Sequence, residues 1–179
     1  MIVKQQLAES IEVKKYVFGD DGNIPNSKLP LLVYKTVLTA EEEDLAHHFE
    51  ELFASNNWIN SWRNGVYPFH HYHSTTHEVL GIYSGTAILH MGGEQGKKME
   101  VCAGDVLVIP AGVGHKKISA SNLGVVGAYP NGRSWDLNRG LPGERPATDK
   151  NISEVPLPKT DPVFGSEHGL MENWHPISR

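Results

Sequence analysis

The chain has 179 residues, which is the length of a single domain with one sizeable core. Hydrophobic residues at 39% and charged residues at 21% are typical of a globular chain and exclude wholesale disorder. The net charge of −5 does not favour a nucleic-acid partner, and the apolar runs are too short to span a membrane. The single cysteine, Cys102, excludes an intramolecular disulfide. The first ten residues lack the apolar core of a signal peptide, so we expect a cytoplasmic protein.

The first part of the chain is predicted to be an arm with two strands and one helix. A first strand is expected near Ile11–Phe18, and the β-branched and aromatic run Leu31–Val37 predicts a second. Thr39 and Glu42 have the spacing of a capping box, and apolar residues follow at helical intervals. This pattern predicts one amphipathic helix over about 40–54.

From about residue 58 to 129, short β segments alternate with turns rich in glycine and proline. The regular spacing and the lack of crossover helices favour an antiparallel sandwich or barrel over a parallel α/β sheet. The predicted strands are Val66–His73, Glu78–Tyr83, Thr86–His90, Lys98–Val101, Val106–Ile109, His115–Ser119 and Val125–Tyr129.

Beyond Pro130 the chain becomes rich in glycine and proline, which predicts an irregular tail laid across the barrel or reaching a neighbouring subunit. The tail contains Trp135, Phe164 and Trp174, which need somewhere to bury. We therefore divide one structural domain into an arm with a strand and helix (1–57), a barrel (58–130) and a C-terminal extension (131–179). Cys102 has no CxxC partner and is expected to be a small buried hydrophobe.

Ten histidines accompany the single cysteine, and four of them lie between positions 70 and 77. His71 and His73 are two residues apart, so on a strand their side chains share one face. Glu78 follows at an odd offset and joins that face only if residues 74–77 turn or bulge. Only a rolled-up sheet would bring the distant His115 back to this pair.

Two spaced motifs indicate a family. The first motif of the cupin superfamily is matched by Gly65, His71, His73, Glu78 and Gly85, and the second by Gly104, Pro110, Gly112 and His115. The second motif departs from the family pattern at its closing Asn, which is Ser119 here. The chain therefore resembles a single-domain cupin, and the segments around both motifs further resemble the YjlB-like bacterial cupins.

The resemblance implies an all-β double-stranded β-helix, or cupin jelly-roll barrel, with one α-helix on the N-terminal side and an irregular C-terminal tail. It also implies one divalent transition metal held by His71, His73, Glu78 and His115. Imidazole and carboxylate ligands suit Fe, Mn, Ni, Co and Zn alike, so the ligand set does not determine which metal binds. A small-molecule substrate or ligand in the barrel and a homodimer are further implications.

The other histidines are expected to have structural or solvated roles. These are His47, His48, His90, His168 and His175. His70 is expected to face outward. His77 is expected to be a turn residue, and the alternatives are that it replaces one expected ligand or acts as a proton shuttle near the metal.

Three functions remain open at this point. The first is a small-molecule metalloenzyme of dioxygenase-like or related type, and the second is a non-catalytic, metal-anchored binding or sensing protein. The third is a sugar-phosphate isomerase, which needs several inward cations. By strand parity only Lys117 and Arg63 are available for that role.

Overall fold

The computed structural model describes residues 9–177 of the chain. Its strands are β1 (Glu12–Phe18), β2 (Ser27–Lys35), β3 (Trp58–Asn64), β4 (Glu78–Met91), β5 (Lys97–Cys102), β6 (Val106–Ile109) and β7 (His115–Pro130). Its helices are α2 (Leu45–Ser55), α3 (Ala147–Glu154) and α4 (Leu170–Asn173). None of the helices between residues 9 and 177 is long and apolar enough to cross a membrane. The prediction that the first ten residues are not a signal peptide concerns a segment of which residues 1–8 lie outside this range.

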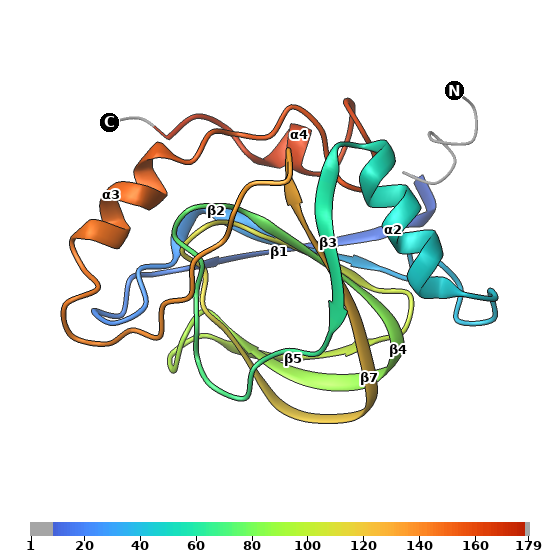
Figure 1. Cartoon of the computed structure of the whole chain (residues 1–179), viewed down its shortest axis with the longest axis horizontal. Helices are drawn as coiled ribbons and strands as arrows, with labels where there is room; N and C mark the ends of the chain where they lie inside the picture. The colour runs from blue at the N-terminus through green and yellow to red at the C-terminus, as the bar shows by residue number, and fades with distance from the viewer. Residues whose placement is uncertain (1–8, 178–179) are drawn as a thin grey trace.

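The strands form an antiparallel sheet that curls into a barrel (Figure 1). The strand order is β1-β2-β6-β4-β7-β3, and β5 pairs with the second half of β4. The long strand β4 therefore contacts β6 and β5 along one edge and β7 along the other. This arrangement confirms the predicted all-β barrel. His115 pairs with Met91 at the far end of β4, so it reaches Glu78 at the start of β4 only because the sheet rolls up.

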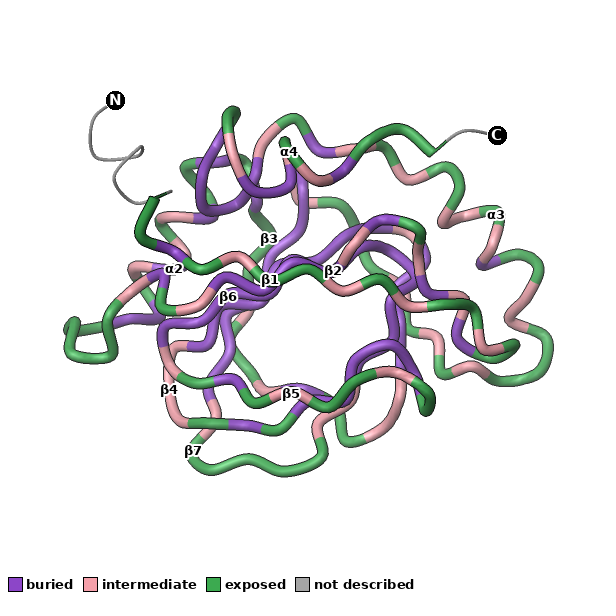
Figure 2. Tube along the Cα trace, turned by 180° about the vertical axis from the view of Figure 1, so that it is seen from behind, coloured by how far each residue is buried: buried purple, intermediate pink, exposed green. Residues whose placement is uncertain are grey.

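Both faces of the central strands are buried, and each face belongs to a different core. Leu31 and Val33 of β2 point into the barrel, where they join one apolar cluster. Leu32 and Tyr34 alternate to the outer face and join a second cluster with residues of α2 and the C-terminal segment. Figure 2 shows the resulting run of buried residues along β2 and β6. Burial on both faces explains why these strands are apolar throughout rather than alternating.

The predicted strand Val66–His73 is wrong, because this segment forms an irregular loop with isolated bridges at His71 and Tyr72. Pro68 lacks an N–H for a strand ladder and lies within it. The strand β3, just upstream, was not among the predicted strands. Elsewhere the predicted short strands merge, since β4 continues through Gly85, which has a φ of 70° at an irregularity in the pairing.

The helix begins at Leu45, five residues later than predicted. The Thr39 N–H does donate to the Glu42 carboxylate at 3.3 Å, but this pair belongs to a turn before the helix. Asp44 is the true N-cap, and its carboxylate accepts from the His47 N–H at 3.3 Å.

The C-terminal segment is laid across the barrel, as Figure 1 shows in orange and red, but it is more regular than predicted because it contains α3 and α4. The buried Asp161 carboxylate organises it by accepting N–H groups from Val163, Phe164 and Leu170 at 2.7–2.9 Å. The Tyr34 hydroxyl of β2 donates to the same carboxylate. This cluster buries Phe164 and Trp174, whereas Trp135 stays 42% exposed.

Cys102 is exposed at the end of β5, so its predicted burial is wrong. The strand alternation places the preceding residue, Val101, in the barrel and turns Cys102 to the outside.

The close packing of α2 on β4 predicts a large effect of one methyl group. A Cβ added at Gly81 would lie 2.8 Å from the Phe49 ring and 2.9 Å from the Phe53 ring. We expect Gly81→Ala to lower the free energy of unfolding by about 1–3 kcal/mol in a denaturant titration. Gly19→Ala is the control, because nothing lies within 4 Å of its added Cβ. Equal stability of the two variants would contradict this packing.

Candidate metal centre

The four predicted metal ligands come from three parts of the chain and lie close together in the structure. His71 and His73 lie in the loop between β3 and β4, whereas Glu78 begins β4 and His115 begins β7. The backbones of His71 and His115 exchange hydrogen bonds of 3.2 and 2.9 Å, which fix the loop against β7. All four side chains line one cavity of about 470 Å³.

The three histidine rings are buried and close to one another. His71, His73 and His115 are 3%, 6% and 2% exposed, and each offers a nitrogen within 4.8 Å of the others. Glu78 is not a member of this mutually close set. Its two carboxylate oxygens lie 3.4 Å from the His73 Nε2 and 3.3 Å from the His115 Nε2.

Each of these rings is held through Nδ1 by a backbone carbonyl oxygen. The distances are 3.0 Å from His71 to Phe69, 2.5 Å from His73 to Asp136 and 3.1 Å from His115 to Val113. A carbonyl oxygen only accepts hydrogen bonds, so each Nδ1 must carry a proton. In a neutral ring this leaves the lone pair on Nε2, the nitrogen available to a metal.

The charges of the site are strongly coupled. Burial, followed by the neighbouring charge at His115, lowers the pKa of His71 to about 2, so this ring is neutral at neutral pH. Burial also disfavours a charge on His73, yet the adjacent Glu78 raises its pKa above the usual value. Glu78 has its pKa held well below the usual range because His73 and His115 outweigh its burial. The carboxylate is therefore ionised and needs a positive partner, either a proton on His73 or a metal ion.

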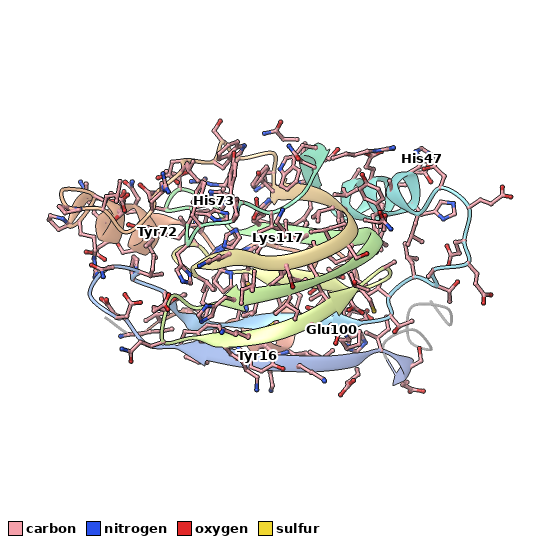
Figure 3. All side chains as sticks on the ribbon, turned by 90° about the horizontal axis from the view of Figure 1, so that it is seen from below. Tyr16, His47, Tyr72, His73, Glu100 and Lys117 are labelled. Atoms are coloured by element: carbon pink, nitrogen blue, oxygen red, sulfur yellow. The ribbon has the colours of Figure 1, made fainter. Side chains whose placement is uncertain are left out.

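The remainder of the cavity combines aromatic rings with one cation. Trp62, Tyr67 and Trp135 line it, and Lys117 enters from β7. Figure 3 labels His73 and Lys117 in the view from below. Burial and the nearby Glu78 charge raise the pKa of Tyr129, whose hydroxyl accepts the Trp62 indole N–H at 2.7 Å. Tyr129 is thus a neutral hydroxyl inside the cavity.

Sequence reasoning missed Asp136, which fixes the loop of His71 and His73 from the C-terminal segment. Its carbonyl oxygen accepts from His73, and its carboxylate accepts from the Ser74 N–H at 2.6 Å and the Thr75 N–H at 3.2 Å. The Trp135 ring also meets the His73 ring edge-on at 5.5 Å. The segment VVGAYPNGRSWD contained both residues, but nothing local in it signals a contact some 60 residues away.

Several other candidates lie outside the cavity lining. The His77 Nδ1 accepts from the Ala111 N–H at 2.9 Å, and its ring packs on Trp174, as befits a structural residue. Arg63 pairs with Glu50 at 2.7 Å on the surface. On α2, His47 lies beside Glu51 and His48 lies beside Glu42. The rings of His70 and His90 lie 4.9 Å apart, outside the cavity lining.

Two sequence comparisons relate this chain to known proteins. The sequence model described as "Cupin" matches residues 36–130. A protein of Bacillus subtilis (strain 168), named "Uncharacterized protein YjlB", is 44% identical over 165 residues, which covers 91% of this chain and 97% of the relative.

Two similar solved structures are metal-containing enzymes. Acireductone dioxygenase from Bacillus anthracis, with a cadmium ion in its active centre, is 17% identical at a TM-score of 0.36, covering 74% of this chain and 84% of its own. Oxalate decarboxylase from Bacillus subtilis, with Mn(II) centres, is 19% identical at a TM-score of 0.35, covering 62% of this chain and 28% of its own. For neither structure is the sequence identity or the TM-score high enough to imply that this chain catalyses the same reaction.

The role of Asp136 predicts a specific effect on metal affinity. We expect Asp136→Ala to weaken Zn²⁺ binding by about 10–100-fold, because it releases the loop that carries His71 and His73. Competition with a chromophoric chelator measures this affinity. Asp149→Ala is the matched control, since it removes only an ion pair with Arg145 in the same C-terminal segment. Equal affinities of the two variants would show that Asp136 has no positioning role.

Proposed function

The chain belongs to the cupin family, and from that premise we propose a divalent-metal-binding cupin that holds one transition-metal ion through His71, His73, Glu78 and His115. We further propose that a small molecule binds beside the ion in the barrel cavity and is transformed there by dioxygenase-like or related chemistry.

The observation that carries the proposal is the shared orientation of three buried imidazoles. Their Nδ1 atoms all donate to carbonyl oxygens, so each ring offers its Nε2 lone pair to the cavity once it is neutral, which for His73 requires loss of a proton. The ionised Glu78 beside two of them supplies negative charge that offsets part of a divalent ion. This donor set fits a five- or six-coordinate metal with open positions. Bound there, the metal would supply a Lewis acid for a substrate oxygen or a position for dioxygen.

The surrounding residues favour a small anionic substrate. Lys117 is the one Lys or Arg among the described residues that line the cavity, so it would orient a carboxylate or similar group. Trp62, Tyr67 and Trp135 provide apolar walls that limit access of water to the substrate. Tyr129 keeps its proton and can donate a hydrogen bond to a substrate oxygen.

Two alternatives fit less of the site. A non-catalytic binding or sensing protein would use the same ion and cavity but show no turnover. A sugar-phosphate isomerase would need more cations, and Arg63 pairs with Glu50 instead of lining the cavity. A homodimer and a cytoplasmic location stay predictions.

The metal site is tested by elemental analysis of protein purified without oxygen. We expect the wild type to retain about one equivalent of Fe, Mn, Ni, Co or Zn after desalting and His73→Ala to retain none. The control His47→Ala, on the exposed face of α2, should behave as the wild type. A wild type that takes up no metal when supplied with these ions would refute the proposal.

The pH dependence of metal affinity follows from the raised pKa of His73. A metal must displace the His73 proton, so competition from protons grows as the pH falls through that pKa and continues to grow below it. Apparent affinity should therefore fall steadily from neutral pH to about pH 5, with proton release on binding seen in unbuffered titrations. A flat affinity over this range would argue against histidine ligands.

Lys117 gives a test of the substrate class. We expect Lys117→Met to weaken the binding of a 2-oxo acid by about tenfold, or about 1.4 kcal/mol, and to leave binding of its amide unchanged. Lys116→Met is the control, because strand alternation turns the neighbouring residue out of the cavity. An equal loss of affinity for the acid and for the amide would mean that Lys117 does not recognise the charge of the carboxylate.

Turnover then separates the enzyme from the binding protein. Oxygen uptake or product formation with catechols, 2-oxo acids or thiols supports a metalloenzyme. Saturable binding without conversion supports the sensing alternative.

A further inference from the structure

A second histidine cluster lies on the outer side of the barrel wall. It consists of His70 in the loop before β4, His90 near the end of β4, and Glu94 in the turn between β4 and β5. Each residue offers a ligand atom within 4.8 Å of the other two. None of them lines the metal-centre cavity.

The strand register explains why this cluster is separate from the first. His115 pairs with Met91 on one side and with His71 on the other, and these residues face the inside of the barrel. The next residue of β7, Lys116, pairs with His90, so alternation turns this row to the outside. His70 precedes His71 in the chain and lies on the same outer side, with its ring 4.9 Å from that of His90.

The contacts within the cluster leave ligand capacity unused. The His70 Nε2 lies 2.8 Å from a carboxylate oxygen of Glu94, while its Nδ1 is buried without a hydrogen-bond partner. A buried, unpaired ring nitrogen is costly in a folded protein and calls for an explanation. His90 is only 6% exposed, whereas the Glu94 side chain is 80% exposed. The imidazole rings of His70 and His90 therefore lie against the outside of the barrel, close to the solvent-exposed carboxylate of Glu94.

We propose that His70, His90 and Glu94 form a second divalent metal site, on the outer wall of the barrel and independent of the inner centre. Two imidazoles and one carboxylate suit Zn²⁺, Co²⁺, Ni²⁺ or Cu²⁺, and water would complete the coordination. The bound ion would tie the loop that carries His71 to the β4–β5 turn.

Nearby positive charge sets the expected strength of this site. Lys98 and Lys116 are the cross-strand neighbours of His90 on its two sides. Their charges oppose a cation, although both side chains have access to solvent, which screens them. With three ligands and opposing lysines, the outer site binds more weakly than an inner site with four ligands.

Zinc titration of the metal-free, untagged protein by calorimetry tests the outer site. We expect the wild type to show two classes of zinc site. Glu94→Gln should weaken zinc binding to one of them by at least roughly tenfold, because the loss of a residue that only hydrogen-bonds to a metal ligand already weakens metal affinity by about tenfold. Glu94 is exposed, so its replacement leaves folding intact. Zinc anomalous diffraction should place the second ion between His70 and His90.

The control is Glu100→Gln, an exposed glutamate on β5 outside the cluster, which should titrate as the wild type. The comparison of Glu94→Gln with the wild type does not require an ion in the inner site, so the two proposals fail separately. Loss of inner zinc in His73→Ala with the outer class retained would support the outer site. Identical titrations of Glu94→Gln and wild type, or an anomalous map with no density at His70 and His90, would overturn it.

Discussion

Three hydrogen bonds from histidine Nδ1 atoms to backbone carbonyls determine what the barrel cavity can do. They fix the proton of His71, His73 and His115 on the outer side of each ring and turn the other nitrogen inward. Free imidazole has no such constraint, and a ring turned over would offer an N–H to a metal instead of a lone pair. The ionised Glu78 beside two of these nitrogens then requires a positive partner, because an unpaired buried carboxylate is strongly unfavourable.

The carbonyls that hold the rings come from three separate segments, and the fold explains their convergence. Phe69 belongs to the loop before β4, Val113 to the turn before β7, and Asp136 to the C-terminal segment. The C-terminal segment stays on the barrel because the outer core buries Phe164 and Trp174 and because Asp161 binds the segment's backbone. Stability of the outer core and geometry of the metal centre are therefore linked through residues far from the cavity.

The antiparallel barrel could be predicted from the spacing of short β segments and turns, and the meeting of the four motif residues from the resemblance of both motifs to the cupin family. Strand alternation did not account for His71 and His73, since their segment is a loop. Prediction from the sequence failed where long-range contacts decide local structure. The loop around Pro68 has β-forming residues but is held by single bridges to other segments, and β3 is an edge strand with polar residues that resemble a turn. Asp136 gave no local signal, and the pairing of His70 with His90 depends on a register that only the folded sheet defines.

The tautomers of the three histidines provide the most direct measurement of the central claim. Long-range ¹H–¹⁵N correlation spectra of zinc-loaded protein distinguish a proton on Nδ1 from one on Nε2. The account predicts that His71, His73 and His115 all carry their proton on Nδ1 and show the ¹⁵N shift of metal coordination at Nε2. A proton on Nε2 of any of the three, or spectra unchanged by zinc, would contradict it.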